Sequence, residues 1–205
     1  MAKGEATRQT ILDHALARSS MVGLEGVTIG ALASELQLSK SGLFAHFKSK
    51  EALQIAVLEE AADRFTEVVI RPALREPRGE GRVRALFERW LAWTKSQAVP
   101  GGCVFVSASV EYDDQPGPVR DYLVRTQQAW IDLIGTTSRF AVEAGHFRAN
   151  LDGLRFAQDF YGILLSHYHF TRLLRDPDTE PRTRAAFEYL IARSRVGSSG
   201  WPVAD

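Results

Sequence analysis

Apolar residues along most of the chain recur every three to four positions, which is the spacing of helices that pack through one face. Residues 7–21 form the first such segment, and its apolar stripe consists of Ile11, Leu12, Ala15 and Leu16. Gly23 and Gly26 follow it, and glycine commonly ends a helix and turns the chain. The pattern therefore predicts a helix over residues 7–21 and a turn directly after it.

Two short segments with apolar faces come next, and each is preceded by a residue that commonly caps a helix. Thr28 precedes a segment with the apolar residues Ile29, Leu32, Ala33 and Leu36. Ser39 precedes a segment in which Leu43 and Phe47 are four positions apart. The two residues between the segments leave room only for a tight turn. This arrangement predicts a helix-turn-helix, whose second helix enters the major groove of DNA.

A long helix is predicted to open at Ser49 and to end at about Ile70, because a residue that precedes a proline, here Pro72, disfavours helical conformation. Further helices are predicted over residues 82–98, 102–112, 117–144, 152–175 and 181–194. Residues 104–110, VFVSASV, have the composition of a strand, but no partner strand is evident and we interpret them as a buried helix.

The predicted fold is all-α, with an N-terminal three-helix head that a long helix joins to a larger C-terminal helical bundle. We expect a DNA-binding domain over residues 1–50 and a ligand-binding and dimerisation domain over residues 51–195. The last segment, residues 196–205, is expected to be a disordered tail.

Composition excludes some kinds of site and location but does not indicate a function. The formal net charge is zero, yet Lys40, Lys48 and Lys50 form a basic cluster without an acidic residue between them. The single cysteine excludes an internal disulfide and a cysteine-based zinc site. No apolar run approaches the ~20 residues of a transmembrane helix and no signal-type segment opens the chain, so we expect a cytoplasmic protein that does not enter the membrane.

The stretch from Gly23 to Leu53 resembles the DNA-binding domain of the tetracycline-repressor-like (TetR) family. The elements of the resemblance are Gly23, Thr28, the pair Leu32-Ala33, Ser39, the aromatic pair Phe44 and Phe47, and Ser49-Lys50-Glu51-Ala52-Leu53. The chain departs from the family pattern at two positions. Gln37 stands where the turn usually has glycine, and Phe44 stands where a tyrosine hydroxyl usually binds phosphate; His46 or Lys48 could replace that contact.

The resemblance implies distinct roles for the head residues. Thr28 and Lys50 correspond to phosphate contacts, and Ser39, Lys40, Ser41 and Gly42 to the surface that reads bases. The predicted DNA-binding residues are Thr28, Ser39, Lys40, Ser41, Gly42, Phe44, His46, Lys48 and Lys50. The alternative is that any one of these side chains is simply solvated on a small helical domain.

The region from residue 82 onward contains more aromatic residues than a DNA-binding head needs. In the resembled family this region is a variable bundle that holds a small-molecule site, and we expect a small hydrophobic effector here. The candidate pocket residues are Trp90, Trp93, Cys103, Trp130, Tyr161 and His167, and the alternative is that they fill the core.

Cys103 precedes a predicted helix, whose N-terminus would lower the pKa of a thiol, so Cys103 is either an electrophile sensor or a small buried apolar residue. His167 and His169 lie on different faces of a helix and cannot share a metal ion. We therefore predict no metal and no cofactor.

The helix predicted over residues 152–175 is apolar on more than one face, and Gly162 and Ser166 would allow close approach of another helix. Together with the last helix, it predicts a twofold interface of four helices in a homodimer. The predicted interface residues are Phe156, Phe160, Ile163, Leu164, Tyr168, Phe187, Leu190 and Ile191.

The sequence therefore predicts a ligand-responsive transcription regulator, a repressor that a small effector releases from a palindromic operator in double-stranded DNA. It does not predict an enzyme, because no glycine-rich phosphate loop or nucleophile elbow is present. The alternative is a dimeric helical interaction or ligand-binding protein whose head no longer binds DNA. The sequence does not specify the operator, the effector or the regulated genes, and repression in place of activation follows from the resemblance alone.

Overall fold

The computed structural model describes residues 3–197, and every regular element among them is a helix. Phe147 and Arg195 form one isolated antiparallel bridge. The predicted all-α fold is thus confirmed for the described residues. The tail predicted over residues 196–205 lies, from residue 198 on, outside them. None of the described helices is both long and apolar enough to cross a membrane.

The chain packs as two compact units, each with its own contacts. The first unit contains the chain up to Val68 together with residues 91–127. The second contains residues 69–90 and the chain from Gln128 onward. Helices α6 (Glu80–Thr94) and α8 (Pro118–Glu143) each contribute residues to both units.

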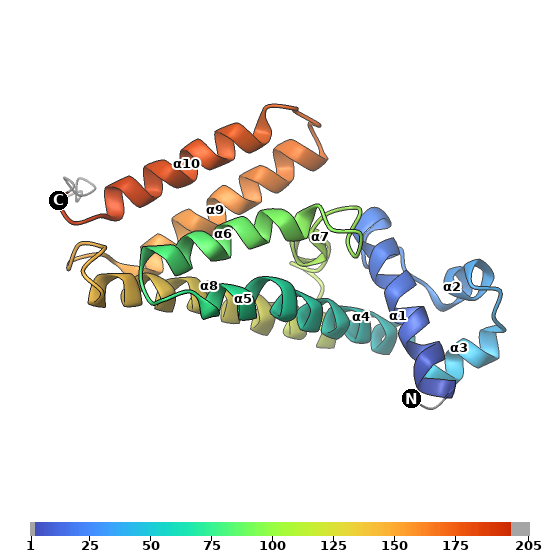
Figure 1. Ribbon diagram of the computed structural model, residues 1–205. Coiled ribbons are helices and arrows are strands. Elements are labelled where there is room, and N and C mark those ends of the chain that lie inside the picture. Colours follow the sequence, from blue (N-terminus) through green and yellow to red (C-terminus); the bar gives the residue numbers. More distant parts are fainter. Residues whose placement is uncertain (1–2, 198–205) are drawn as a thin grey trace. The chain divides into compact units, whose positions relative to one another are not determined.

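The first unit contains the predicted head, whose helices occur in the expected order (Figure 1). They are α1 (Lys3–Val22), α2 (Ile29–Glu35), α3 (Lys40–His46) and the beginning of α4 (Lys50–Phe65). Their inward-facing apolar residues are almost completely buried: Ile11, Leu16, Leu32, Leu43, Phe47 and Leu53. Helix α2 contacts both α1 and α3, and α1 contacts α4, so burial of this shared core holds the head together.

Helix α7 (Val104–Glu111) belongs to the same unit and confirms the helical interpretation of residues 104–110. Val104 and Val106 are buried, which explains a strand-like composition in a helix: the segment is apolar because it is enclosed. Helix α7 contacts both α1 and α4.

The prediction that the long helix ends before Pro72 was wrong. A π-helical segment, Thr66–Ile70, follows α4, and a further helix, α5 (Arg71–Arg75), contains Pro72 in its first turn. Proline is tolerated there because the first turn of a helix does not use the N–H group that proline lacks. The wider π-helical turn restarts the hydrogen-bond pattern, so the chain stays helical past the proline.

The second unit is held together by aromatic rings from three helices: α6, α9 (Gly153–Arg172) and α10 (Thr179–Ser194). Helices α9 and α10 lie side by side (Figure 1). The rings of Phe87 and Phe187 are stacked with centroids 3.9 Å apart, and Phe160 meets both edge-on. These contacts place one continuous aromatic core between the three helices.

This core corrects the predicted dimer interface. Five of its eight residues are buried within the single chain: Phe156, Phe160, Leu164, Phe187 and Ile191. At most 2% of each is exposed, so they have no surface left to offer a partner. The other three, Ile163, Tyr168 and Leu190, are half-buried. The apolar face that the sequence assigned to a partner is mainly the one that packs α9 on α10 and α6.

Glu80, the first residue of α6, forms ion pairs with Arg84 on the same helix and with Arg195, the residue that follows α10. Its carboxylate accepts hydrogen bonds from Arg195 at 2.6 and 2.8 Å and from Arg84 at 2.7 Å. Arg84 in turn binds Glu188 on α10. The hydrogen bonds from Arg195 and Arg84 lower the pKa of Glu80 to about 2, although burial of the carboxyl acts in the opposite direction.

Glu80→Gln is expected to lower the free energy of unfolding at neutral pH by roughly 1–3 kcal/mol, because the ion pairs with Arg195 and Arg84 are lost. A depressed carboxyl pKa stabilises the fold above the unfolded value of 4.5, and this contribution disappears as the pH falls toward about 2. Urea unfolding of both proteins between pH 7 and pH 2 measures the difference. Glu143→Gln on the exposed end of α8 is the control. A difference independent of pH would contradict the assignment.

Candidate nucleic-acid interface

Three side-chain caps fix the helix starts of the head at the residues that the sequence indicated. Thr28 Oγ1 accepts a hydrogen bond from the backbone N–H of Ala31, and Ser39 Oγ accepts one from that of Gly42. Ser49 Oγ caps α4 in the same way, because it accepts a hydrogen bond of 3.0 Å from the backbone N–H of Ala52. The Ser39 hydroxyl that caps α3 also lies 3.2 Å from the hydroxyl of Ser41. These caps determine where each helix begins.

The turn between α2 and α3 contains a backbone conformation that favours glycine, but the residue there is Gln37. Gln37 has a φ of 56°, in the left-handed region. Its N–H group donates to the carbonyl of Ser34, and that of Leu38 donates to the carbonyl of Ala33 at 2.9 Å. This pair of bonds is the Schellman motif that commonly ends a helix. The departure from the family pattern at Gln37 therefore leaves the turn itself intact, at the cost of a strained backbone.

The outward side of α3 is a small, exposed surface, and we name it the reading face. Its exposed residues are Lys40, Ser41, Gly42, Phe44 and Ala45. Leu43 and Phe47 point inward and are buried, which leaves the intervening positions facing solvent. Phe44 is 55% exposed and gives this face one large apolar ring.

The other predicted DNA-binding residues lie at the ends of α3, apart from Thr28 and Lys50, which stand at the starts of α2 and α4. Ser39 and Lys48 are exposed, and His46 is half-buried beside the Phe47 ring, with centroids 6.3 Å apart. Lys50 opens α4 and forms an ion pair with Glu25, in the turn before α2. A phosphate would therefore have to compete with Glu25 for Lys50. The contacts of all these residues with DNA remain a prediction.

The predicted pocket residues fall into separate places. In the second unit, Trp90 is buried and meets the His167 ring edge-on, with centroids 5.8 Å apart. His167 is itself buried, and its Nδ1 lies 3.0 Å from Thr183 Oγ1, which links α9 to α10. Trp130 is also buried. These contacts favour the alternative that the three rings pack the core.

Cys103 and Trp93 are buried in the first unit. Burial raises the pKa of the Cys103 thiol, although hydrogen bonds from the backbone of Val106 and Phe105 and from Trp93 oppose the shift. The prediction that the following helix lowers this pKa was wrong, because enclosure of the thiol outweighs the backbone donors. The structure thus favours the small buried residue over the electrophile sensor.

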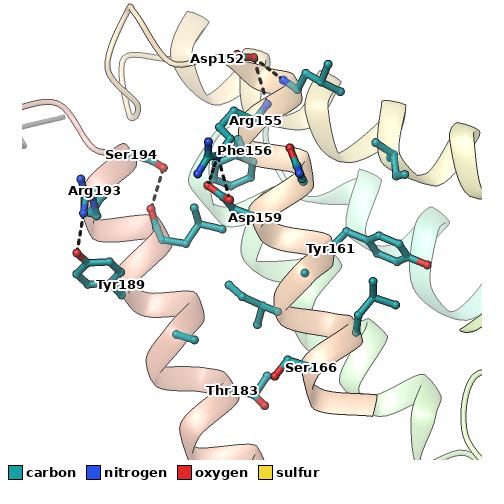
Figure 2. A pocket seen from close by; sticks show the side chains of 18 of the residues that line it. Asp152, Arg155, Phe156, Asp159, Tyr161, Ser166, Thr183, Tyr189, Arg193 and Ser194 are labelled. Carbon is teal, nitrogen blue, oxygen red and sulfur yellow. Dashed lines mark hydrogen bonds and ion pairs between the residues drawn. The ribbon is translucent and has the colours of Figure 1, made fainter. Parts of the chain in front are cut away.

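A groove of about 1470 Å³ lies on the second unit along α9 and α10. Figure 2 shows Tyr189 and Arg193 on α10 and Arg155, Asp159 and Tyr161 on α9. Tyr161 is the one predicted pocket residue that lines it. Its exposed apolar and small lining residues include Leu154, Gly162, Leu165, Ser166, Phe170 and Ala186. The sequence pointed to Gly162 and Ser166 but not to the other four, although Gly162, Ser166 and Phe170 recur every four positions along α9.

The described residues contain no evident metal site. Among residues 3–197, no three His, Cys, Asp or Glu side chains are grouped in a way that could hold an ion.

The head and the remainder of the chain together have the architecture of a helical regulator with a helix-turn-helix. A family model described as "Tetracyclin repressor-like, C-terminal domain" matches residues 79–187, which is more than half of the chain. A second, described as "Bacterial regulatory proteins, tetR family", matches residues 11–57. The chain therefore belongs to the tetracycline-repressor (TetR) family of transcriptional regulators, and the resemblance inferred from the sequence is confirmed.

Solved structures share the fold over nearly the whole chain. A TetR transcriptional regulator from Chloroflexus aurantiacus is 23% identical, with a TM-score of 0.80, and the match covers 93% of this chain and 95% of that one. A putative regulator from Saccharomonospora viridis in complex with choline is 19% identical, with a TM-score of 0.80 and coverages of 93% and 98%.

A third similar structure is AibR in complex with isovaleryl coenzyme A and operator DNA. It is 22% identical, with a TM-score of 0.70, and the match covers 90% of this chain and 97% of AibR. The search of curated proteins found no match. At these identities the likeness establishes the fold, and the ligands named belong to those proteins.

Gln37→Gly is expected to raise the free energy of unfolding by about 1 kcal/mol, because glycine adopts the left-handed conformation without a steric cost. Chemical denaturation of the two proteins measures the difference. Gln37→Ala is the matched control, since alanine keeps the Cβ atom and should gain nothing. Equal stability of the glycine and alanine variants would show that the turn is not strained.

Proposed function

We propose that the protein is a homodimeric repressor that binds a palindromic operator and is released from it by a small hydrophobic effector. The observation that carries the proposal is the reading face of α3, which is exposed and composed of small or polar residues around Phe44, over a fully buried inner face. Such a face suits close approach to base edges in the major groove. The protein would act in the cytoplasm and would catalyse no reaction.

The roles of the two parts of the chain follow the sequence prediction. Residues 1–50 bind DNA, and residues 51–195 bind the effector and the second subunit. The matching structures with choline, and with isovaleryl coenzyme A and operator DNA, support a small-molecule site on this fold. The effector shifts the protein toward the subunit geometry that binds DNA less well, by as much as its affinity differs between the two geometries.

The groove on α9 and α10 supports the homodimer. Leu165 and Phe170 are exposed along α9, and 60% of Tyr189 on α10 is exposed. A Cβ atom built on Gly162 would meet nothing within 4 Å, so the backbone of α9 is open to close approach by another helix. We assign the partner surface to this exposed groove, in place of the buried residues indicated by the sequence.

The alternative function is a dimeric ligand-binding protein whose head no longer binds DNA. The pairing of Lys50 with Glu25 is compatible with both functions, because an ion pair on the surface is weak and exchangeable. Steep dependence of DNA binding on salt separates them.

Lys50→Ala is expected to weaken binding to every duplex and to reduce the slope of log affinity against log salt by about 0.9, the value for one phosphate contact. The operator is first selected from random-sequence duplexes with the wild-type protein. Fluorescence anisotropy across a salt series then compares the wild type with Lys50→Ala.

Lys95→Ala, a lysine outside the head, is the control and should leave the slope unchanged. Selection of a palindrome and loss of one phosphate contact support the repressor head. Failure of the wild type to enrich any sequence would favour the alternative function.

Ala186→Arg is expected to convert the dimer into monomers, because a charged side chain would enter the groove where the helices of the partner pack. Sedimentation velocity measures the change. Val110→Glu, which alters an exposed apolar residue of α7, is the control and should remain dimeric. A dimeric Ala186→Arg protein would place the interface elsewhere.

A further inference from the structure

The carboxylate of Glu111, at the C-terminal end of α7, binds the turn that leads into the helix-turn-helix. Its Oε1 accepts a hydrogen bond from the N–H group of Leu24 at 3.1 Å, and its Oε2 accepts one from that of Glu25 at 2.8 Å. Both donors lie between α1 and α2, where no helix satisfies them. Bonds from two neighbouring N–H groups to one ionised carboxylate are among the stronger contacts of a protein surface.

Gly23 makes this approach possible. Its φ of 83° lies in the left-handed region, and a Cβ atom built on it would come within 2.6 Å of Glu111 Oε1. The glycine therefore does more than turn the chain after α1, since any side chain at this position would displace the carboxylate.

The next residue of the turn, Glu25, connects α7 with α4. Its Oε2 accepts a hydrogen bond of 2.7 Å from the hydroxyl of Tyr112, the residue that follows α7, and its other oxygen pairs with Lys50. Gln54 of α4 donates to the carbonyl of Leu24 at 3.2 Å. The bonds from Lys50 and Tyr112 lower the pKa of Glu25, which keeps it ionised. Tyr112 is itself buried.

We propose that Glu111 and Tyr112 are positioning residues for DNA binding, through which α7 sets the pose of the turn before α2. This inference rests on the proposed function, and it names the contacts through which DNA binding is regulated. The assigned role of these two residues is to position the turn, and neither is assigned a contact with bases. They hold the turn before α2, the helix on which α3 packs.

The contacts form a relay with two ends. At one end, Glu25 of the turn pairs with Lys50 of α4. At the other end, Glu111 is the last residue of α7 and Tyr112 directly follows it, and α7 lies outside the head. Withdrawal of the end of α7 by a few ångströms would break both hydrogen bonds of Glu111 and the bond of Tyr112, because such bonds fail beyond about 3.5 Å. The turn would then lose its fixed pose while the head remained folded.

Glu111→Gln tests the proposal because it preserves shape. A glutamine oxygen can accept one N–H group, but the glutamine NH₂ group faces the second donor and cannot accept from it. The affinity of the full-length protein for its selected operator is expected to fall about tenfold, the loss that corresponds to one hydrogen bond to a charged group. Affinity for a scrambled duplex of the same length is expected to stay within about twofold, since phosphate attraction does not need the pose of α3.

Tyr112→Phe removes a single hydroxyl and is the second variant, expected to lower the ratio of operator to scrambled-duplex affinity in the same direction. Glu143→Gln, at an exposed position of α8, is the matched control and should leave the ratio unchanged. A merely structural role would reduce the folded fraction and lower both affinities equally, so the ratio separates positioning from destabilisation.

A reduced ratio for both variants, with the control unchanged, supports the relay. An unchanged ratio in a wild-type protein that binds its operator would overturn it and leave the proposed function standing. A wild-type protein without any preferred duplex would refute the proposed function and this inference together.

Discussion

The reading head depends on burial of the apolar side of its two short helices. Helices α2 and α3 contain seven residues each, fewer than an isolated helix needs in water. Leu32 and Leu43 have no exposed surface, and 2% of Phe47 is exposed, so packing supplies the stability that length does not. The same packing decides which residues of α3 face outward. The surface offered to DNA is therefore a consequence of the core beneath it.

The head was predictable because its signals are local. Thr28, Ser39 and Ser49 each cap the helix that they precede, as their side-chain chemistry and position indicated. The helical state of residues 104–110 also followed, since no segment nearby could pair with a strand. Pro72 was misjudged because sequence rules describe α-helices, whereas a π-helical turn before the proline lets the helical path continue.

The dimer surface and the pocket depended on information that periodicity does not contain. Helix α9 is apolar on two faces, and the pattern cannot tell which face meets its own core and which is exposed. Phe160 and Phe187 proved to be internal, whereas Leu165 and Phe170 remained exposed. The hydrogen bonds of Glu111 could not be predicted from the sequence either, because they join its side chain to backbone groups 86 and 87 positions away.

The most direct test of the account attaches a DNA-cleaving iron chelate to the reading face. The only native thiol, Cys103, is buried, so Ala45→Cys on α3 provides a selective attachment point. If α3 enters the major groove in each half of a twofold dimer, cleavage of the selected operator will cluster at two sites about one helical turn (~34 Å) or a related spacing apart. Uniform cleavage along the duplex, or none, would contradict the central claim that this face reads DNA.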